Sequence, residues 1–239
     1  MSDGNWVSLF SGGKDSVGAF WRARESGRSV GHLLTVHPEG DSYLYHVPGT
    51  GLATLAAESI GLPLRSVRGP SATGHDASRR GDEELVPLEE ALSDLEDHLD
   101  GGVAGVTVGA IESRYQRDRI AGMCDRLGVE LYAPLWGADP RELGEWFLEA
   151  GFEITIVQVA AAGFDRSWLG RRLDEGTLSD LATLREEYGV HLLGEGGEYE
   201  TIVTDGPHMD RAIEIEATPV WDGTRGHLDI EDARLEPAP

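Results

Sequence analysis

Six consecutive residues near the amino terminus have the types and spacing of a phosphate-binding loop. They are Ser11, Gly12, Gly13, Lys14, Asp15 and Ser16. An apolar run over 6–10 precedes them and a helical pattern over 17–25 follows, which predicts a strand, a turn and a helix amino terminus. Glycines let backbone N–H groups approach phosphate oxygens closely, and the helix start adds partial positive charge. With the mobile full charge of Lys14, the run predicts an anion site.

The order of residues excludes a Walker-type loop. That loop requires Gly-x-x-x-x-Gly-Lys followed by Ser or Thr. Here Asp15 follows Lys14, and the earlier glycine is missing. The structural alternative is a plain Gly-Gly turn with Ser16 capping the helix. The six matched positions in a strand–turn–helix context favour the phosphate loop.

A second polar run, 109–119, begins where another buried strand is expected to end. Ser113 and Gln116 stand at capping-box spacing, which predicts a helix start. Cations are disfavoured in the first turns of a helix, yet three arginines stand there. They are Arg114, Arg117 and Arg119. The arginines either pair with a bound anion or form a solvated face balanced by nearby carboxylates, and the sequence leaves both open.

The run 194–201, Gly-Glu-Gly-Gly-Glu-Tyr-Glu-Thr, is the second unusual feature. Closely spaced glutamates repel one another, and glycines lose much conformational entropy on folding, so such a run is unfavourable for stable structure. It therefore indicates either a site that binds a cationic ligand or an acidic hairpin turn. Mg²⁺, ammonium or a quaternary ammonium would suit the carboxylates, and Tyr199 could add a cation–π contact. Earlier in the chain, the segment 41–46 holds two tyrosines and a histidine that either contact substrate or pack against the protein.

The surrounding pattern predicts an α/β fold. Apolar strand-like runs alternate with helical patterns through the first half, which implies a parallel sheet with helices on both faces and ligands at the carboxyl ends of strands. Strands are expected at 6–10, 30–36, 64–67, 103–108 and 130–132, and helices at 17–25, 51–60, 83–99 and 113–127. Three loops, after 10, 36 and 108, should therefore converge on one edge.

After about residue 135 the pattern changes to that of a smaller α+β domain. We expect helices at 141–150 and 178–188 and strands at 152–160, 198–204 and 212–216. The expected division is 1–135 for the first domain, 136–217 for the second, and 218–239 for a peripheral acidic tail. The polar stretch 69–81 is either a mobile loop or a long connection.

The amino-acid composition limits the kinds of partner that the protein is expected to bind. The 239 residues include 20 basic and 43 acidic residues, a net charge of −23, and Lys14 is the one lysine. An acidic, lysine-poor surface is typical of salt-rich cytoplasm, as in halophilic archaea, and it argues against nucleic-acid or membrane binding. Cys124 stands alone, so we interpret it as a buried small hydrophobe. With neither a signal peptide nor a long apolar run, we expect a soluble cytoplasmic protein.

These motifs together resemble a known family. The first loop resembles the Ser-Gly-Gly-x-Asp-Ser loop of the ATP pyrophosphatases, the PP-loop ATPases. The order and spacing of the remaining motifs resemble the diphthine–ammonia ligase family from about Trp6 to Ile215. The matching segments are 11–16, Ser42-Tyr43 with His46, 109–119, Pro134-Leu135-Trp136, Trp168-Leu169-Gly170 and 194–201.

The resemblance implies an adenine-nucleotide hydrolase-like domain and the last step of diphthamide synthesis. ATP would adenylate the carboxylate of diphthine, a trimethylammonium-bearing modified histidine on translation elongation factor two. Pyrophosphate would leave, and ammonium would supply the amide nitrogen. Lys14, Asp15 and Glu198 would be catalytic, with Asp15 also a contact to Mg²⁺.

The resemblance also assigns binding residues. ATP would be held by the loop Ser11, Gly12, Gly13, Lys14, Asp15 and Ser16 together with Val36, His37, Gly109 and Ala110. The substrate side would comprise Ser42, Tyr43, His46, Ser113, Gln116, Arg119, Glu195, Gly196, Gly197, Glu198, Tyr199 and Glu200. A homo-oligomer stays open. The alternatives are an ATP pyrophosphatase that acts on tRNA and a non-catalytic ATP-sensing module.

Overall fold

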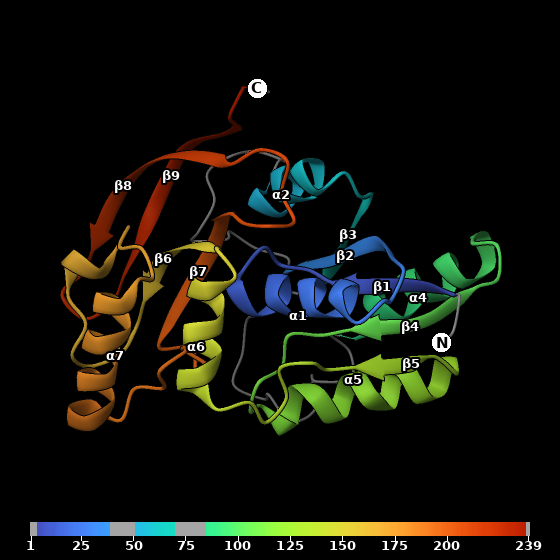
Figure 1. Ribbon diagram of the computed structural model, residues 1–239, viewed down its shortest axis with the longest axis horizontal. Helices are drawn as coiled ribbons and strands as arrows, with labels where there is room; N and C mark the ends of the chain where they lie inside the picture. Colours follow the sequence, from blue (N-terminus) through green and yellow to red (C-terminus); the bar gives the residue numbers. More distant parts are fainter. Residues whose placement is uncertain (1–3, 39–50, 70–84, 238–239) are drawn as a thin grey trace. The chain divides into compact units, whose positions relative to one another are not determined.

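The computed structural model describes residues 4–38, 51–69 and 85–237. They form two compact units, each with its own β-sheet (Figure 1). The first unit holds residues 4–11, 15–38, 62–69 and 85–136, and the second holds 12–14, 51–61 and 137–237. The division is therefore not a single cut near residue 135. The middle of the phosphate loop and the segment 51–61 group with the second unit.

The sheet of the first unit is parallel, as expected. Its strand order is β3-β2-β1-β4-β5. The strands are β1 (Asn5–Leu9), β2 (Val30–Pro38), β3 (Leu64–Gly69), β4 (Val103–Thr107) and β5 (Glu130–Tyr132). Because β1 lies between β2 and β4 and the three strands are parallel, their carboxyl ends lie at the same edge of the sheet. The predicted common edge is confirmed for the ends of these strands, while the loop after β2 lies outside the described residues.

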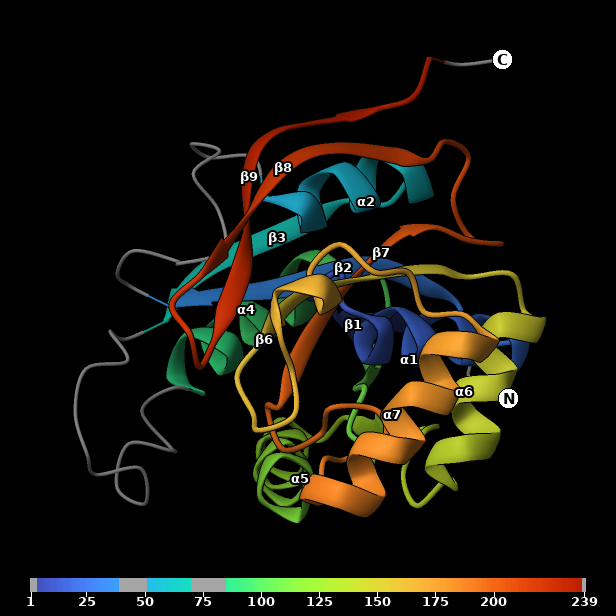
Figure 2. The same ribbon diagram turned by 90° about the vertical axis from the view of Figure 1, so that its left-hand side faces the viewer.

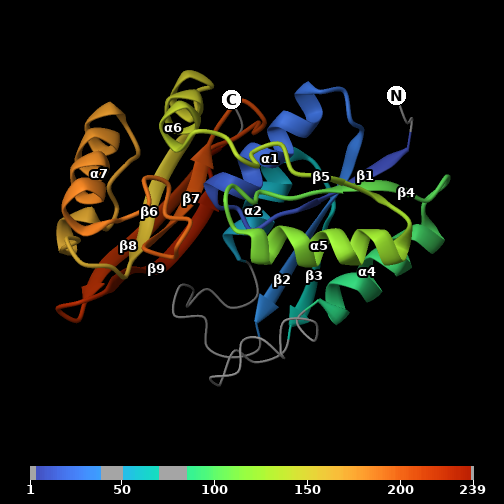
Figure 3. The same cartoon turned by 90° about the horizontal axis from the view of Figure 1, so that it is seen from below.

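Helices cover both faces of this sheet (Figure 3). They are α1 (Lys14–Glu25), α4 (Val86–His98) and α5 (Arg114–Leu127). Helices α4 and α5 share one core with the strands, in which Leu92, Met123 and Val106 are buried together. Helix α1 packs on the opposite face, where the hydroxyl of Thr107 donates to the carbonyl of Ala19 at 3.5 Å. Val106 and Thr107 are adjacent in β4 and point to opposite faces of the sheet, because successive side chains of a strand alternate between the two faces.

The second unit is an antiparallel sheet in the order β7-β6-β9-β8. In Figure 2, α6 and α7 lie side by side and α2 lies beside β9, in agreement with their contacts. The elements are α2 (Leu52–Ile60), α6 (Pro140–Glu149), β6 (Glu153–Val159), the 3₁₀ helix η1 (Arg166–Trp168), α7 (Glu175–Tyr188), β7 (Tyr199–Asp205), β8 (Ile213–Trp221) and β9 (Gly226–Leu235). In the described part of the chain, every helix is too short or too polar to cross a membrane.

The expectation of a peripheral tail from residue 218 is wrong. Strand β9 lies inside the sheet, paired with both β6 and β8. Leu228 and Ile230 are buried, whereas the acidic residues beside them along the strand point the other way. The acidic composition of this segment led to the prediction of a solvated tail. A half-buried strand, however, needs an apolar residue only at every second position, so acidic residues can occupy the positions between.

Cys124 lies in the core of the first unit and is 2% exposed, which confirms the expected buried position. Burial disfavours the charged thiolate, and the Asp125 carboxylate adds to this effect. Together they raise the pKa of the thiol from 9.0 to about 11. A thiol with such a pKa is unreactive at neutral pH.

Candidate active site

The phosphate loop has the expected strand–turn–helix form, but α1 begins at Lys14, three residues earlier than predicted. Gly12 has a φ of +84°, a conformation that glycine adopts without strain. The backbone N–H of Ser11 donates to the hydroxyl of Ser16 at 3.1 Å, so the two ends of the loop are joined. The loop therefore wraps around the amino terminus of α1, where partial positive charge favours an anion.

Lys14 does not carry the mobile charge that the sequence predicted. Its side chain is only 3% exposed. Its ammonium lies 5.4 Å from the centroid of the Tyr199 ring, a cation–π distance. A buried cation held in one place is a preorganised electrostatic group, and it needs no reorganisation when negative charge develops beside it.

The loop after β4 packs closely on the first turn of α1. A Cβ placed on Gly109 would lie 2.4 Å from the carbonyl carbon of Asp15 and 2.7 Å from the nitrogen of Ser16. Gly109 is therefore needed for this approach rather than for an unusual φ. Ala110 is buried in the same loop. The structure thus joins the predicted nucleotide residues of two loops at one edge of the sheet.

The third predicted nucleotide segment is the end of β2. Strand β2 pairs with β1 along 30–34 and runs on to Pro38, so its end lies at the same sheet edge. Val36 is 37% exposed there. The side chain of His37 lies outside the described residues, as do Ser42, Tyr43, His46 and the stretch 70–81. Contacts of these residues with a ligand stay predictions.

The arginines at the start of α5 stack on aromatic rings. The Arg117 guanidinium lies 4.5 Å from the Trp136 ring centroid, and that of Arg119 lies 4.8 Å from the ring of Tyr115. Ser113 precedes the helix, as its capping-box spacing predicted, while the side chain of Gln116 is not described. Neither alternative from the sequence included these contacts: the ring of Trp136 comes from a segment beyond α5, whereas Tyr115 lies one turn before Arg119 on the same helix, a spacing visible in the sequence.

The glycine- and glutamate-rich run forms a tight loop before β7. Gly194 and Gly197 have φ values of +71° and +79°. The carboxylate of Glu198 accepts the backbone N–H of His191 at 3.0 Å and that of Gly196 at 2.8 Å. Glu198 thus holds the loop in shape, so its carboxylate is directed at the protein's own backbone.

Tyr199 and Glu200 follow this loop on opposite faces of β7. The Tyr199 ring is buried, and its hydroxyl donates to the carbonyl of Leu192 at 2.8 Å. Glu200 keeps part of its surface open to solvent. The surrounding protein still removes enough water to raise the pKa of its carboxyl, an effect that the charge of Lys14 partly offsets. Glu195 is half-buried, and Gly196 is exposed.

The two unusual runs meet within the second unit. The backbone N–H of Lys14 donates to the Thr201 hydroxyl at 3.3 Å, and the carbonyl of Gly12 accepts the N–H of Val203 at 3.0 Å. Together with the Tyr199 contact, these bonds attach residues 12–14 to the first half of β7. Thr201 and Val203 were absent from the predicted site. Thr201 ends the 194–201 motif, but Val203 acts through its backbone and leaves no signal in the sequence.

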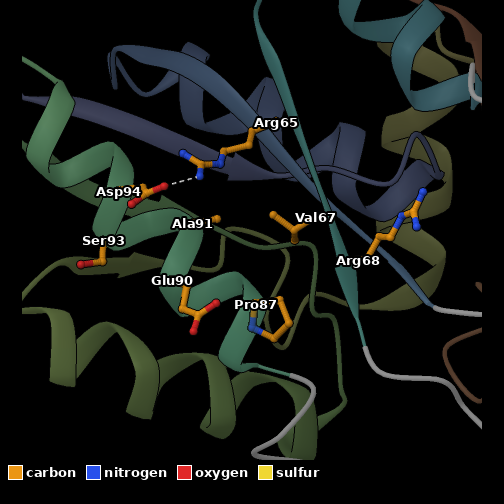
Figure 4. A pocket seen from close by; sticks show the side chains of 8 residues that line it. All are labelled: Arg65, Val67, Arg68, Pro87, Glu90, Ala91, Ser93 and Asp94. Carbon is orange, nitrogen blue, oxygen red and sulfur yellow. Dashed lines mark hydrogen bonds and ion pairs between the residues drawn. The ribbon is translucent and has the colours of Figure 1, made fainter.

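A hollow of about 570 Å³ lies between β3 and α4 in the first unit (Figure 4). An ion pair between Arg65 and Asp94 crosses it, with Nη2 and Oδ2 at 2.5 Å. The ion pair holds the pKa of Asp94 below its usual range. None of the predicted site residues lines this hollow, so it is separate from the candidate active site.

The fold and the loop define the class of protein. A parallel sheet whose first strand leads through Ser-Gly-Gly-Lys-Asp-Ser into a helix is the construction of the PP-loop ATP pyrophosphatases. Two family models match most of the chain: the diphthamide synthase N-terminal domain over residues 4–131 and the diphthamide synthase C-terminal domain over residues 139–235. The chain belongs to the diphthamide synthase family.

The related proteins compared with this chain are named diphthine–ammonia ligases. A zebrafish (Danio rerio) diphthine–ammonia ligase is 37% identical over 223 residues, covering 89% of this chain and 86% of that protein. The human (Homo sapiens) diphthine–ammonia ligase is 34% identical over 229 residues, covering 90% and 84%. The Schizosaccharomyces pombe ligase is 33% identical over 233 residues, which are 93% of this chain but 38% of that longer protein.

One solved structure is also similar. It is titled a predicted subunit of tRNA methyltransferase from Methanocaldococcus jannaschii, with a TM-score of 0.45 and 16% identity over 85% of this chain and 97% of that one. At these values the likeness carries no argument about function.

Proposed function

We propose that this chain amidates diphthine on translation elongation factor two, with ATP and ammonium as co-substrates and AMP and pyrophosphate as products. The observation that carries the proposal is the cluster of Lys14 with Tyr199, Glu200 and Thr201. It joins the phosphate loop to the most distinctive motif that the chain shares with the diphthine–ammonia ligase family.

The reaction needs two steps. A carboxylate is a poor electrophile, because its leaving group would be oxide. In the first step, a carboxylate oxygen of diphthine bonds to the α-phosphorus of ATP, and the bond from that phosphorus to the β-phosphate oxygen breaks. In the second, ammonia bonds to the acyl carbon and AMP leaves with the former carboxylate oxygen. The ammonium ion loses one proton before attack and the amine a second afterwards, so the product is a neutral amide.

The described residues suit the first step. Pyrophosphate departs with added negative charge, which the Lys14 ammonium and the N–H groups at the start of α1 would stabilise. Mg²⁺ would shield the phosphates, held by Asp15 together with phosphate oxygens and water, the usual arrangement for this ion.

The described residues also suit the substrate. Diphthine carries a permanent positive charge on its trimethylammonium group. The exposed Glu200 carboxylate would attract such a group by its charge. We place Glu195 and Glu200 on this side of the site, and Glu198 behind them as the residue that holds the loop.

A reconstituted assay tests the function. Purified protein is incubated in high salt with ATP, ammonium and elongation factor two that carries diphthine, and pyrophosphate is measured. Release that requires both the factor and ammonium is the expected result. Binding of ATP without turnover would favour a sensing module, and release stimulated by tRNA would favour an ATP pyrophosphatase that acts on tRNA.

We further propose a cytoplasmic protein adapted to high salt. A net charge of −23 on 239 residues destabilises the compact state through self-repulsion. At about 1 M salt, the Debye length of about 3 Å removes most of that repulsion. The melting temperature should therefore rise steadily between about 0.1 M and 1 M KCl, and a melting temperature independent of salt would contradict the adaptation.

A further inference from the structure

A row of side chains crosses the sheet of the second unit, starting at Glu200. In the strand register, Glu200 stands opposite Gln158, Gln158 opposite His227, and His227 opposite Val220. Residues directly opposite in neighbouring strands point to the same face. The adjacent row, with Tyr199 and Val159, is buried and faces the core. The row from Glu200 to Val220 therefore lies on the other face.

The far end of this row opens into a pocket of about 420 Å³. Gln158 and His227 form its polar wall, and Val220, 42% exposed, forms its apolar rim. The turn between β8 and β9 closes the pocket. Asp222 holds this turn by accepting the backbone N–H groups of Thr224 and Arg225, each at 2.9 Å. The side chains left to meet a ligand through hydrogen bonds are the amide of Gln158, the ring of His227 and, at the turn, the guanidinium of Arg225, which also pairs with Asp222 at 3.5 Å.

We propose that this pocket binds the imidazole ring of diphthine and the backbone beside it. The inference rests on the proposed function and adds a specificity site to it. Neighbouring strands are about 4.8 Å apart, so His227 lies roughly 10 Å along the row from Glu200. A short aliphatic chain separates the imidazole of diphthine from its trimethylammonium group and carboxylate. One molecule therefore spans the row, with its charged end at Glu200 and its ring at Gln158 and His227.

The chemistry of the two ends differs as the substrate requires. A neutral imidazole has one N–H donor and one acceptor nitrogen, and the amide of Gln158 and the ring of His227 both donate and accept. The trimethylammonium group has no N–H, so a carboxylate such as Glu200 binds it by charge alone. The pocket is larger than one ring, which leaves room for the neighbouring backbone of the elongation factor.

The test separates the two ends of the row. Three pocket variants are compared: Gln158→Ala, His227→Ala and Val220→Trp, which fills the pocket from its exposed rim. Val86→Trp is the matched control, because Val86 is 49% exposed and lies on α4. We expect the pocket variants to raise the KM for the diphthine-bearing factor at least tenfold, with kcat and the KM for ATP within twofold of the wild type. A change in kcat or in the KM for ATP of the same size would overturn the proposal.

Elongation factor two with an unmodified histidine supplies a second readout. It has the imidazole but lacks the charged end, so it should inhibit competitively, and His227→Ala should weaken that inhibition about tenfold while Glu200→Gln leaves it unchanged. Absence of inhibition, or equal effects of the two variants, overturns the pocket assignment alone. A wild-type protein that releases no pyrophosphate with the diphthine-bearing factor would remove the proposed function, and the pocket assignment with it.

Discussion

The Lys14 ammonium lies 5.4 Å from the centre of the Tyr199 ring, although 185 positions separate the two residues in the chain. This contact places the cation of the phosphate loop against the start of β7. The Tyr199 hydroxyl is bonded to the carbonyl of Leu192, so the ring cannot turn away without losing a buried hydrogen bond. The tyrosine thus fixes the position of the lysine, and it also connects the lysine to the loop that Glu198 shapes.

Lys14→Ala should lower pyrophosphate release at least about 100-fold, because removing one preorganised charge from a developing anion typically has an effect of this size. The measurement is factor-dependent pyrophosphate release, with circular dichroism to check the fold. Arg24→Ala is the control, since Arg24 is an exposed cation of the same helix. Release from Lys14→Ala at the wild-type rate would show that the lysine has no part in the reaction.

Tyr199→Phe and Tyr199→Leu should behave differently. The first keeps the ring beside Lys14 but leaves the Leu192 carbonyl without its donor, so it should reduce the free energy of unfolding by about 1–3 kcal/mol with little loss of activity. The second also removes the cation–π partner and should lower kcat. Denaturant unfolding and steady-state kinetics measure the two effects. Equal kcat values for the two variants would exclude a role for the ring.

Glu198→Gln should loosen the loop before β7. The carboxylate accepts two backbone N–H groups, and an amide presents one oxygen and a donor that repels the second N–H. We expect a loss of about 1–3 kcal/mol in the free energy of unfolding and a larger rise in the KM for the diphthine-bearing factor than in that for ATP. Glu187→Gln on the exposed face of α7 is the control. Equal rises in both KM values would instead place this loop on the nucleotide side.

Gly109→Ala should destabilise the nucleotide edge. Its Cβ would stand 2.4 Å from the Asp15 carbonyl carbon, a backbone atom that cannot move aside alone. Overpacking of this kind reduces the free energy of unfolding by about 1–3 kcal/mol, and the displaced first turn of α1 should weaken ATP binding in calorimetry. Gly31→Ala is the matched control, because an added Cβ there meets nothing within 4 Å. If both variants bound ATP equally well, the close approach would be irrelevant to the nucleotide.

Because the Cys124 thiol is buried, we expect the free energy of unfolding to decrease at alkaline pH. Its thiol pKa is raised from 9.0 to about 11 in the folded protein. Between these pH values the unfolded chain releases the thiol proton and the folded chain keeps it, so the stability falls as the pH rises. A shift of this size corresponds to roughly 2–3 kcal/mol. Unfolding curves at pH 8 and pH 11 should therefore differ more for the wild type than for Cys124→Ala, and an identical difference would contradict a buried thiol.

Much of the fold follows from local patterns. The runs 6–10, 30–36 and 103–108 predicted β1, β2 and β4, because buried parallel strands are continuous apolar segments. The alternation of strands with helices predicted the parallel sheet and the edge where the nucleotide loops converge. Strand β9 was missed, because its acidic residues alternate with few apolar ones and resemble a solvated tail.

The candidate active site also has features that the sequence predicted and features that only the folded structure shows. The six residues from Ser11 to Ser16 indicate a phosphate loop by themselves, since their chemistry depends on neighbours in the chain and on the helix that follows. Their sequence also predicted a mobile lysine, whereas the tertiary structure buries Lys14 against Tyr199. Sequence periodicity describes only neighbouring residues, so it cannot predict a contact between segments so far apart. The inward direction of Glu198 has the same origin: a carboxylate bonds to whichever N–H groups the fold brings within reach, and only the folded loop supplies those of His191 and Gly196.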